Sequence, residues 1–180
     1  MMTLRAIEPE DLELLYTIEN SPEMWDVSGF SATPYSRFAL RQYIENCCPD
    51  LAQAGEMRLV IEHDGKGVGL IDLTDYSARD NRAEVSIAIL KEHRRKGLGR
   101  QALTELERLA KSQYNLRMLY ALVSENHNPT AQELFLECGY LQTSTLKEWH
   151  FRNGEYENVN VFQKKSAFFL KSSWSVKKKL

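Results

Sequence analysis

Long apolar runs are missing from this sequence. No stretch of about 18 consecutive apolar residues occurs, so the sequence predicts no membrane-spanning helix and no membrane partner. Acidic residues and Pro9 stand near the start, where a secretory leader needs an apolar stretch of about 7 or more residues. We therefore expect a cytoplasmic protein.

Cysteine is also scarce. The three cysteines are Cys47, Cys48 and Cys138, and an odd number with two adjacent members is unlike a disulfide framework. No Cys or His pair has the spacing of a zinc site, so we expect no metal. We interpret the thiols as reduced and structural, with a catalytic thiol as the alternative.

Neither sign of charge is in large excess. The net charge is −2 and the isoelectric point is about 6.1. A protein that collects nucleic acid carries a broad basic field, so no nucleic-acid partner is expected. Any phosphate-bearing ligand has to be held by a local cluster of residues.

The length of 180 residues, with 43% hydrophobic residues, suits one core. We predict one domain over residues 1–163 and a basic extension over residues 164–180. The extension mixes aromatic residues with lysines. We interpret it as a packed or frayed end, with an amphipathic helix for a membrane surface or a partner as the alternative.

Hydrophobic periodicity predicts a mixed α/β chain. Asp64-Gly65 marks a hairpin, and the strand, helix, strand order after residue 83 implies a parallel pair. No helical or strand period is visible between Ser21 and Pro34, which is expected to be a loop. The expected helices cover residues 9–20, 36–48, 97–110 and 128–138, and the expected strands cover 3–7, 57–63, 68–73, 83–90, 118–123 and both sides of 153–154.

A basic, glycine-containing turn joins the strand 83–90 to the next helix. Its sequence is Arg94-Arg95-Lys96-Gly97-Leu98-Gly99, followed by Arg100. A helix N-terminus offers unpaired N–H groups and partial positive charge, and glycine lets a phosphate approach the backbone. The turn therefore predicts a pyrophosphate site, and a solvated basic turn is the plain alternative.

Two familiar phosphate loops fit this turn poorly. Gly97 to Ala102 satisfies the bare Gly-x-Gly-x-x-Ala form of the dinucleotide fingerprint. Six mostly charged residues separate it from the strand, however, and Tyr120 stands where the fingerprint expects an acid. No Gly-Lys-Ser/Thr follows, so a Walker A loop is excluded. A nicotinamide oxidoreductase therefore remains only a weak alternative.

The turn resembles motif A of the GNAT acetyltransferases, Arg/Gln-x-x-Gly-x-Gly/Ala, at Arg94, Gly97 and Gly99. A second GNAT element matches at Asn128-Pro129-Thr130-Ala131, Phe135 and Gly139-Tyr140, and the order of elements fits from Thr3 to about Gln163. Four further stretches are most similar to the spermidine/diamine and ribosomal-protein N-acetyltransferase type. They are residues 61–72, 82–85, 115–120 and 151–156.

The resemblance implies an α/β (α+β) GNAT fold. This is a mixed central sheet of about seven strands, antiparallel in its N-terminal part, flanked by about four helices. It also implies an enzyme that passes the acetyl group of acetyl-CoA directly to an amine in a ternary complex. The residues expected to bind acetyl-CoA are Ile87, Ala88, Ile89, Arg94, Arg95, Lys96, Gly97, Leu98, Gly99, Arg100, Asn128 and Phe135. The groups at 87–89 are expected to act through their backbone.

Glu84 is the expected general base, by the same resemblance. The alternative is that Glu84 only pairs with Arg82 or Arg79 on the sheet surface. Many relatives carry a tyrosine at the position of Phe135, which has no proton to give to the departing thiolate. This difference raises a second hypothesis from another class, a CoA-binding sensor or regulatory module without catalysis.

The acceptor stays open between a small amine or polyamine, an amino sugar and a protein N-terminus. A polyamine calls for a carboxylate cluster, but residues 21–36 offer only Glu23 and Asp26. Trp25, Phe30 and Tyr35 in the same segment either pack or shape a substrate pocket. Homo-oligomerisation is also left open.

Overall fold

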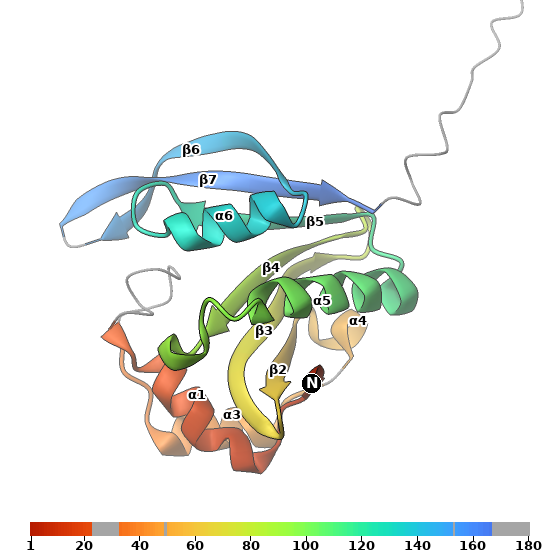
Figure 1. The fold of residues 1–180 in the computed structure, drawn as a ribbon, viewed down its shortest axis with the longest axis vertical. Helices are drawn as coiled ribbons and strands as arrows, with labels where there is room; N and C mark the ends of the chain where they lie inside the picture. Colours follow the sequence, from red (N-terminus) through yellow and green to blue (C-terminus); the bar gives the residue numbers. More distant parts are fainter. Residues whose placement is uncertain (23–32, 49, 153, 167–180) are drawn as a thin grey trace, which may run out of the picture.

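A computed structural model describes residues 1–22, 33–48, 50–152 and 154–166 (Figure 1). The loop residues Glu23, Trp25, Asp26 and Phe30 lie outside the described residues. So do Asn153 and most of the expected C-terminal extension. The last strand continues through Lys165, past the boundary expected at 163. The division into a domain and an extension stays a prediction.

One seven-stranded sheet forms the centre of the molecule, in the order β1-β2-β3-β4-β5-β7-β6. Neighbouring strands are antiparallel except β4 and β5, which are parallel. The elements are β1 Met2–Ala6, η1 Pro9–Asp11, α1 Leu12–Glu19, α3 Arg37–Glu45, α4 Leu51–Ala54, β2 Met57–His63, β3 Lys66–Ser77, β4 Arg82–Ile89, η2 Lys91–His93, α5 Leu98–Tyr114, β5 Met118–Ser124, α6 Pro129–Glu137, β6 Leu141–Arg152 and β7 Glu155–Lys165. This confirms the expected mixed sheet with an antiparallel N-terminal part.

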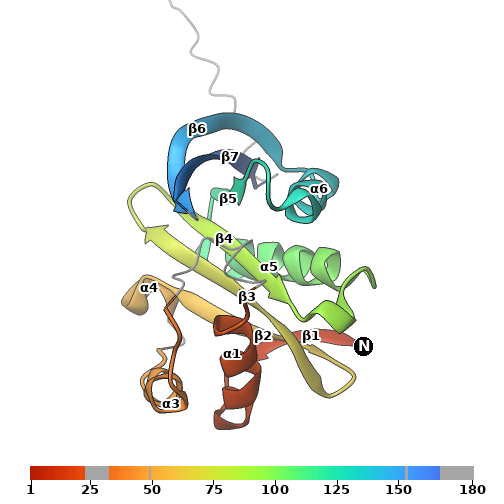
Figure 2. The ribbon, with the colours of Figure 1, turned by 90° about the vertical axis from the view of Figure 1, so that its left-hand side faces the viewer.

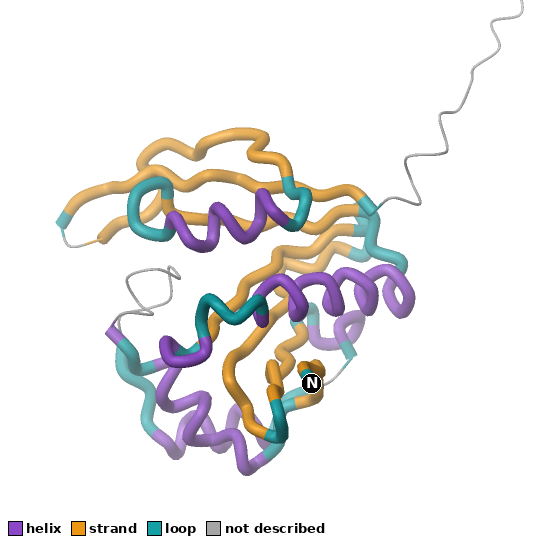
Figure 3. The backbone as a smooth tube through the Cα atoms, viewed as in Figure 1, coloured by secondary structure: helices purple, strands orange, loops and turns teal. Residues whose placement is uncertain are grey.

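Helices cover both faces of the sheet (Figures 2 and 3). On one face α5 and α6 bury a large apolar cluster that includes Val85, Leu106 and Phe162. On the other face α1 and α3 bury a smaller cluster with Val60, Leu70 and Ala88. Alternate residues of β4 therefore enter opposite cores, as the period of a strand requires. In the described part of the chain, no helix is long and apolar enough to cross a membrane.

Local signals explain most element ends. The Ser36 hydroxyl accepts a hydrogen bond from the Ala39 N–H at 3.1 Å and caps α3, the helix expected to begin near residue 36. Asp64 and Gly65 both have positive φ, 50° and 76°, which is the tight hairpin turn expected for this dipeptide. The short helix α4 was not predicted. Asp50 caps its start, and Gly55 in the left-handed region ends it.

Gly69 lies where the backbones of β3 and β4 approach closely. A Cβ atom built on Gly69 would lie 2.3 Å from the Ala88 carbonyl oxygen and 3.1 Å from the Ile89 Cα. We expect Gly69→Ala to force the strands apart and to lower the free energy of unfolding by about 1–3 kcal/mol. Thermal or urea unfolding measures the change.

Gly65→Asn is the matched control. Nothing lies within 4 Å of a Cβ at Gly65, and asparagine is the side chain that best tolerates its positive φ of 76°. The control should change stability by only a few tenths of a kcal/mol, which is roughly the range of a harmless surface substitution. If the two variants lose the same free energy of unfolding, the close approach of β3 to β4 is not the reason that residue 69 must be glycine.

Candidate active site

The parallel strands β4 and β5 pair at only one end. Their register covers Arg82↔Met118, Ala83↔Leu119 and Glu84↔Tyr120. Beyond Glu84, β4 stays paired with β3 and β5 stays paired with β7, so residues 85–89 have no β5 partner. Figure 1 shows the two strands diverging from this point. The edge of β4 that faces β5 therefore offers backbone N–H and C=O groups to a bound extended molecule.

Two helices begin beyond the C-terminal ends of these diverging strands (Figure 1). α5 starts after Gly97, whose φ of 75° places it in the left-handed region, and α6 starts after Asn128. The N–H groups in the first turn of a helix lack intrahelical acceptors and carry partial positive charge. The α5 start is therefore suited to an anion such as a pyrophosphate.

Gly99 lets α5, α6 and β4 meet closely at this place. A Cβ at Gly99 would lie 3.2 Å from Leu134 Cδ2 and 3.5 Å from Ile89 Cδ1. A larger side chain would push α5 away from both neighbours. The Gly-x-Gly pattern thus has two physical roles, with Gly97 making the turn and Gly99 permitting close packing.

The basic side chains of the turn differ in their surroundings. Arg94 is half-buried, and its Nε donates a hydrogen bond to the Ile89 carbonyl at 2.8 Å. Arg100 makes an exposed ion pair with Glu137 at 2.9 Å. Arg95 and Lys96 are exposed at the start of α5. Arg94 therefore ties the turn to the end of β4, while Arg95 and Lys96 are open to a ligand phosphate.

Several residues expected to bind the coenzyme place their side chains in the core. Leu98 is 2% exposed, Ala88 is 8% exposed, and Ile87 and Ile89 pack against the large cluster. Only their backbone groups are therefore suited to a ligand, which agrees with the role expected for 87–89. Asn128 uses its side-chain oxygen to accept from the Ala131 N–H at 3.0 Å and caps α6.

Phe135 is a core residue in this structure. Its ring is 2% exposed, and its centroid lies 5.0 Å from that of Tyr140 and 6.1 Å from that of Phe162. A direct contact between Phe135 and the coenzyme stays a prediction. Tyr140 is 1% exposed and also packs here. Burial raises the pKa of the Cys138 thiol, which opposes a catalytic thiolate at this place.

A polar cluster surrounds Glu84 where β4 and β5 still pair. Asp75 makes an ion pair with Arg82 and accepts a hydrogen bond from the Tyr120 phenol. The Arg82 guanidinium also lies 5.6 Å from the centre of the Tyr120 ring. Glu84 sits opposite Tyr120 in the strand register, so its carboxyl lies beside the Tyr120 phenol. Arg82 thus pairs with Asp75 and not with Glu84, contrary to the alternative drawn from the sequence.

The pKa of Glu84 is raised. Burial is the main cause, and the charge of Asp75 adds to it, while the Tyr120 contact acts in the opposite direction. A base that removes a proton from an ammonium group works better when its pKa lies closer to neutral pH. The surroundings of Glu84 therefore favour the role of general base.

Sequence reasoning missed Asp75 and Tyr120 as members of this site. Tyr120 could have been found, because the parallel register places it on the same face as Glu84. Asp75 lies in an irregular part of β3 between Thr74 and Ser77 and has a positive φ of 45°. Strand alternation gives no signal for such a residue.

Three features of the site define the class of protein. The parallel strands β4 and β5 separate, the start of α5 beyond them suits a phosphate, and the half-buried carboxyl of Glu84 lies beside them. Together they are typical of an acyltransferase that takes its acyl group from a coenzyme A thioester. A family model described as an acetyltransferase (GNAT) domain matches residues 2–140. The chain belongs to the GNAT acetyltransferases. Its activity is acetyl transfer from acetyl-CoA to an amine.

Relatives of known function agree with this assignment. The spermidine N(1)-acetyltransferase of Vibrio cholerae is 30% identical over 159 residues, which cover 88% of this chain and 89% of that protein. A crystal structure of spermidine N-acetyltransferase from Vibrio cholerae with CoA and spermine superposes with a TM-score of 0.83 at 27% identity, covering 94% of this chain and 98% of that chain. A dodecameric structure of the Vibrio cholerae enzyme has a TM-score of 0.77 at 28% identity, covering 96% and 98% of the two chains. These similarities support the enzyme and not the CoA-binding sensor or regulatory module.

Proposed function

We propose that this protein acetylates a small primary amine of the polyamine class, with Glu84 as the general base. The observation that supports the base most directly is the half-buried Glu84 carboxyl with its raised pKa at the point where β4 and β5 separate. The polyamine class is supported by the similarity to the spermidine N-acetyltransferase of Vibrio cholerae, whose structure with CoA and spermine superposes on this chain. Amino sugars and protein N-termini remain outcomes of the test.

The acceptor approaches from the face of the sheet opposite α5. Ala83 and Val85 pack into the cluster beneath α5, so Glu84 between them points to the other face. Ser86 also lies on that face, because its hydroxyl is 3.2 Å from Asp72 Oδ2. Asp72 makes an ion pair with Arg58, which also pairs with Glu19, and Asp75 makes an ion pair with Arg82. Glu84 makes no ion pair with any described residue, so we propose its carboxylate as the partner of an incoming ammonium group.

The coenzyme would lie along the free edge of β4. Backbone groups of 85–89 would hold its extended arm, and the α5 start with Arg95 and Lys96 would hold its pyrophosphate. Side chains of 87–89 are already packed, which leaves the backbone for this purpose. The bound thioester supplies the acyl group and a good leaving group.

Glu84 removes a proton from the ammonium group, directly or through a water molecule. The freed nitrogen lone pair attacks the thioester carbonyl carbon, and negative charge develops on the carbonyl oxygen. Backbone N–H groups on the β4 edge stabilise that charge. The carbonyl double bond then re-forms as the C–S bond breaks, and the electron pair of that bond leaves on sulfur. The nitrogen, which is cationic after the attack, releases its second proton to water, and the neutral amide results. Phe135 has no proton to donate, so we propose that the thiolate leaves unaided.

An amine panel tests the proposed function. Release of free thiol from acetyl-CoA is measured with spermidine, spermine, simple diamines, an aminoglycoside and short peptides, and thermal stabilisation by CoA is measured alongside. We expect CoA to stabilise the protein and thiol release to be fastest with the polyamines. Preference for a peptide or aminoglycoside would move the acceptor to another class. Stabilisation by CoA without turnover on any amine would contradict catalysis.

A further inference from the structure

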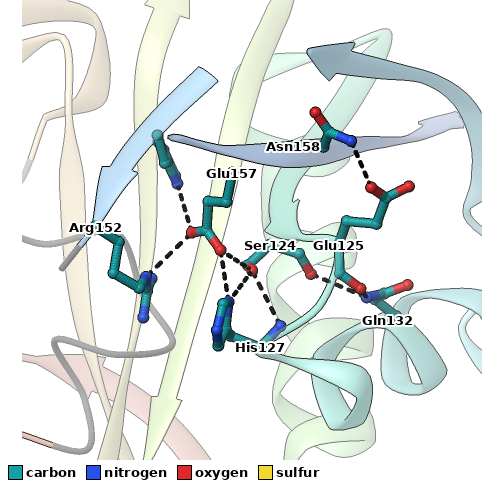
Figure 4. A network of polar contacts seen from close by, with 8 residues as sticks. Ser124, Glu125, His127, Gln132, Arg152, Glu157 and Asn158 are labelled. Atoms are coloured by element: carbon teal, nitrogen blue, oxygen red, sulfur yellow. Dashed lines mark hydrogen bonds and ion pairs between the residues drawn. The ribbon is translucent and has the colours of Figure 1, made fainter. Parts of the chain in front are cut away.

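The buried carboxylate of Glu157 lies beside the far end of β5 and takes no part in the mechanism above. The Glu157 side chain is 7% exposed. The Ser124 hydroxyl donates to Glu157 Oε2 at 2.8 Å, and His127 Nδ1 lies 2.6 Å from the same oxygen. Arg152 Nε donates to Glu157 Oε1 at 3.2 Å, and His150 Nδ1 lies 3.7 Å from that oxygen. Figure 4 shows these side chains converging on Glu157 from β5, β6 and the turn before α6.

This network binds the turn between β5 and α6 to β7. The His127 N–H donates to the Ser124 hydroxyl at 3.1 Å, so Ser124 links the turn to Glu157. The Glu125 N–H donates to the Asn158 carbonyl at 3.0 Å, and the Asn158 amide donates to the Glu125 carboxylate at 2.7 Å. Both ends of the turn are thus attached to β7 by polar contacts.

The same contacts fix the beginning of α6. Gln132 in its first turns donates to the carbonyls of Ser124 and Glu125, both at 2.9 Å (Figure 4). Asn128, the residue after His127, caps the helix. The position of the α6 start is therefore set by the turn, and the position of the turn is set by Glu157 and Asn158.

A cavity of about 360 Å³ borders the network around Glu157, and its lining includes Asn126, His127, Arg152 and Asn158. Because this lining is polar, apolar packing does not hold the turn in place on the side of the cavity. A buried ionised group costs free energy of desolvation unless all its partners are in place. Burial opposes the ionisation of Glu157, but Ser124, His127 and Arg152 outweigh it, and the pKa of the carboxyl lies below its ordinary value.

We propose that Glu157 is a positioning residue for the coenzyme. It holds the β5–α6 turn and the α6 start so that the β5 side of the opened strand pair keeps the separation that the coenzyme requires. β5 has no β4 partner beyond Tyr120, so its far end depends on β7 and on this network for its position. The inference rests on the proposed placement of the coenzyme between β4 and β5.

Glu157→Gln tests this role. The amide keeps the size of the side chain but is neutral. It therefore accepts hydrogen bonds from Ser124, His127 and Arg152 more weakly than the ionised carboxylate does. We expect the Kd for CoA and the KM for acetyl-CoA to rise about 5- to 10-fold, because a charge-assisted bond is lost. At saturating acetyl-CoA, kcat should stay within about 2-fold, since Glu84 and its surroundings are untouched. Amide hydrogen exchange should become faster over residues 125–131.

A control separates positioning from stability. Asp11→Asn also weakens a buried carboxylate, which accepts from Arg5 of the edge strand β1 at 2.6 Å and from the Glu8 N–H at 2.9 Å, and which has no hydrogen bond to β5, α6 or the turn between them in the described part of the chain. It should lower the Tm and leave the Kd for CoA unchanged. His127→Asn is a second variant that keeps Ser124 and Arg152 on Glu157. It should raise the Kd for CoA in the same direction by a smaller factor.

The outcomes distinguish this inference from the proposed function. Unchanged CoA affinity in both Glu157→Gln and His127→Asn, with the wild-type enzyme active on amines, would overturn the positioning role and leave the function standing. Equal loss of CoA affinity in Asp11→Asn would overturn it as well, because the effect would then follow stability alone. Failure of the wild-type protein to bind CoA would instead contradict the proposed function.

Discussion

Glu84→Gln lowers kcat for amine acetylation by about 10²- to 10⁴-fold, the range typical for loss of a general base. The reason is that glutamine cannot take the proton that must leave the ammonium group before it attacks. The KM for acetyl-CoA should not change, because the coenzyme groups lie on the β4 edge and at α5 and not at this carboxyl. Steady-state kinetics with the best amine of the panel measure both constants.

The pH profile gives this prediction a second readout. In the wild type, activity rises with pH as Glu84 loses its proton, and burial together with the charge of Asp75 moves this rise above the ordinary pH range of a glutamate. In Glu84→Gln this limb should disappear, leaving only the rise that belongs to the free amine. Glu105→Gln on the exposed surface of α5 is the control and should behave as wild type. Unchanged kcat and an unchanged profile in Glu84→Gln would remove Glu84 from the mechanism.

Stability distinguishes a catalytic Glu84 from a structural one. Folding raises the pKa of Glu84, so its ionised form is less favourable in the folded protein than in the unfolded chain. Below the unfolded-state pKa both states are protonated and there is no cost, while above the folded-state pKa the full cost is present. Glutamine is neutral and removes this cost. Glu84→Gln should therefore keep or slightly raise the Tm near neutral pH while activity falls.

Much of the fold could be predicted from the sequence because its signals are local. The Asp64-Gly65 turn, the Ser36 cap and the alternation along 83–90 each depend on a few neighbouring residues, and all of them are present in the structure. The parallel β4–β5 pair followed from the helix between the two strands. The Gly97-Leu98-Gly99 turn lies at the start of α5 as the sequence predicts, and its role as an anion site stays a prediction.

The rest of the site depends on contacts between distant segments. Asp75 reaches Tyr120 only because β3 is irregular before Ser77. Glu157 meets Ser124 and His127 across 33 and 30 residues of chain, so no local pattern indicates the network. A family motif predicts that Phe135 contacts the coenzyme, and the structure shows its ring in the core, so that contact stays a prediction.

The face proposed to receive the amine is built on a half-buried arginine. Arg58 on β2 donates from Nη1 to Glu19 at 2.7 Å, and from Nε and Nη2 to the two oxygens of Asp72 at 3.1 and 3.0 Å. The side chains of the three residues are 17%, 9% and 6% exposed. This group joins α1, β2 and β3 beneath the surface on which Ser86 and Glu84 lie.

Arg58→Leu lowers the free energy of unfolding by about 3–5 kcal/mol, because it removes the guanidinium from two buried carboxylates. For a protein of this size the Tm should fall by roughly 10 °C. Arg37→Leu is the matched control. Arg37 bonds Glu13 at a similar 2.7 Å, but the two side chains are 51% and 67% exposed, so we expect a loss below about 1 kcal/mol. Similar losses in both variants would show that burial does not set the strength of the Arg58 group.

A triple variant distinguishes two explanations for the cost of Arg58→Leu. Either the ion pairs stabilise the fold, or the cost comes from leaving two buried carboxylates without their cation. Arg58→Met combined with Glu19→Gln and Asp72→Asn removes the cation and both of its carboxylates together. If the cost of Arg58→Leu is mainly that of unpaired buried charge, the triple variant should recover most of the lost stability. No recovery would mean that the ion pairs themselves stabilise the packing of α1 on β2 and β3. If the triple variant recovers its stability, its KM for the amine can be compared with that of the wild type. A change in that KM would show that the Arg58 group shapes the surface beside Glu84.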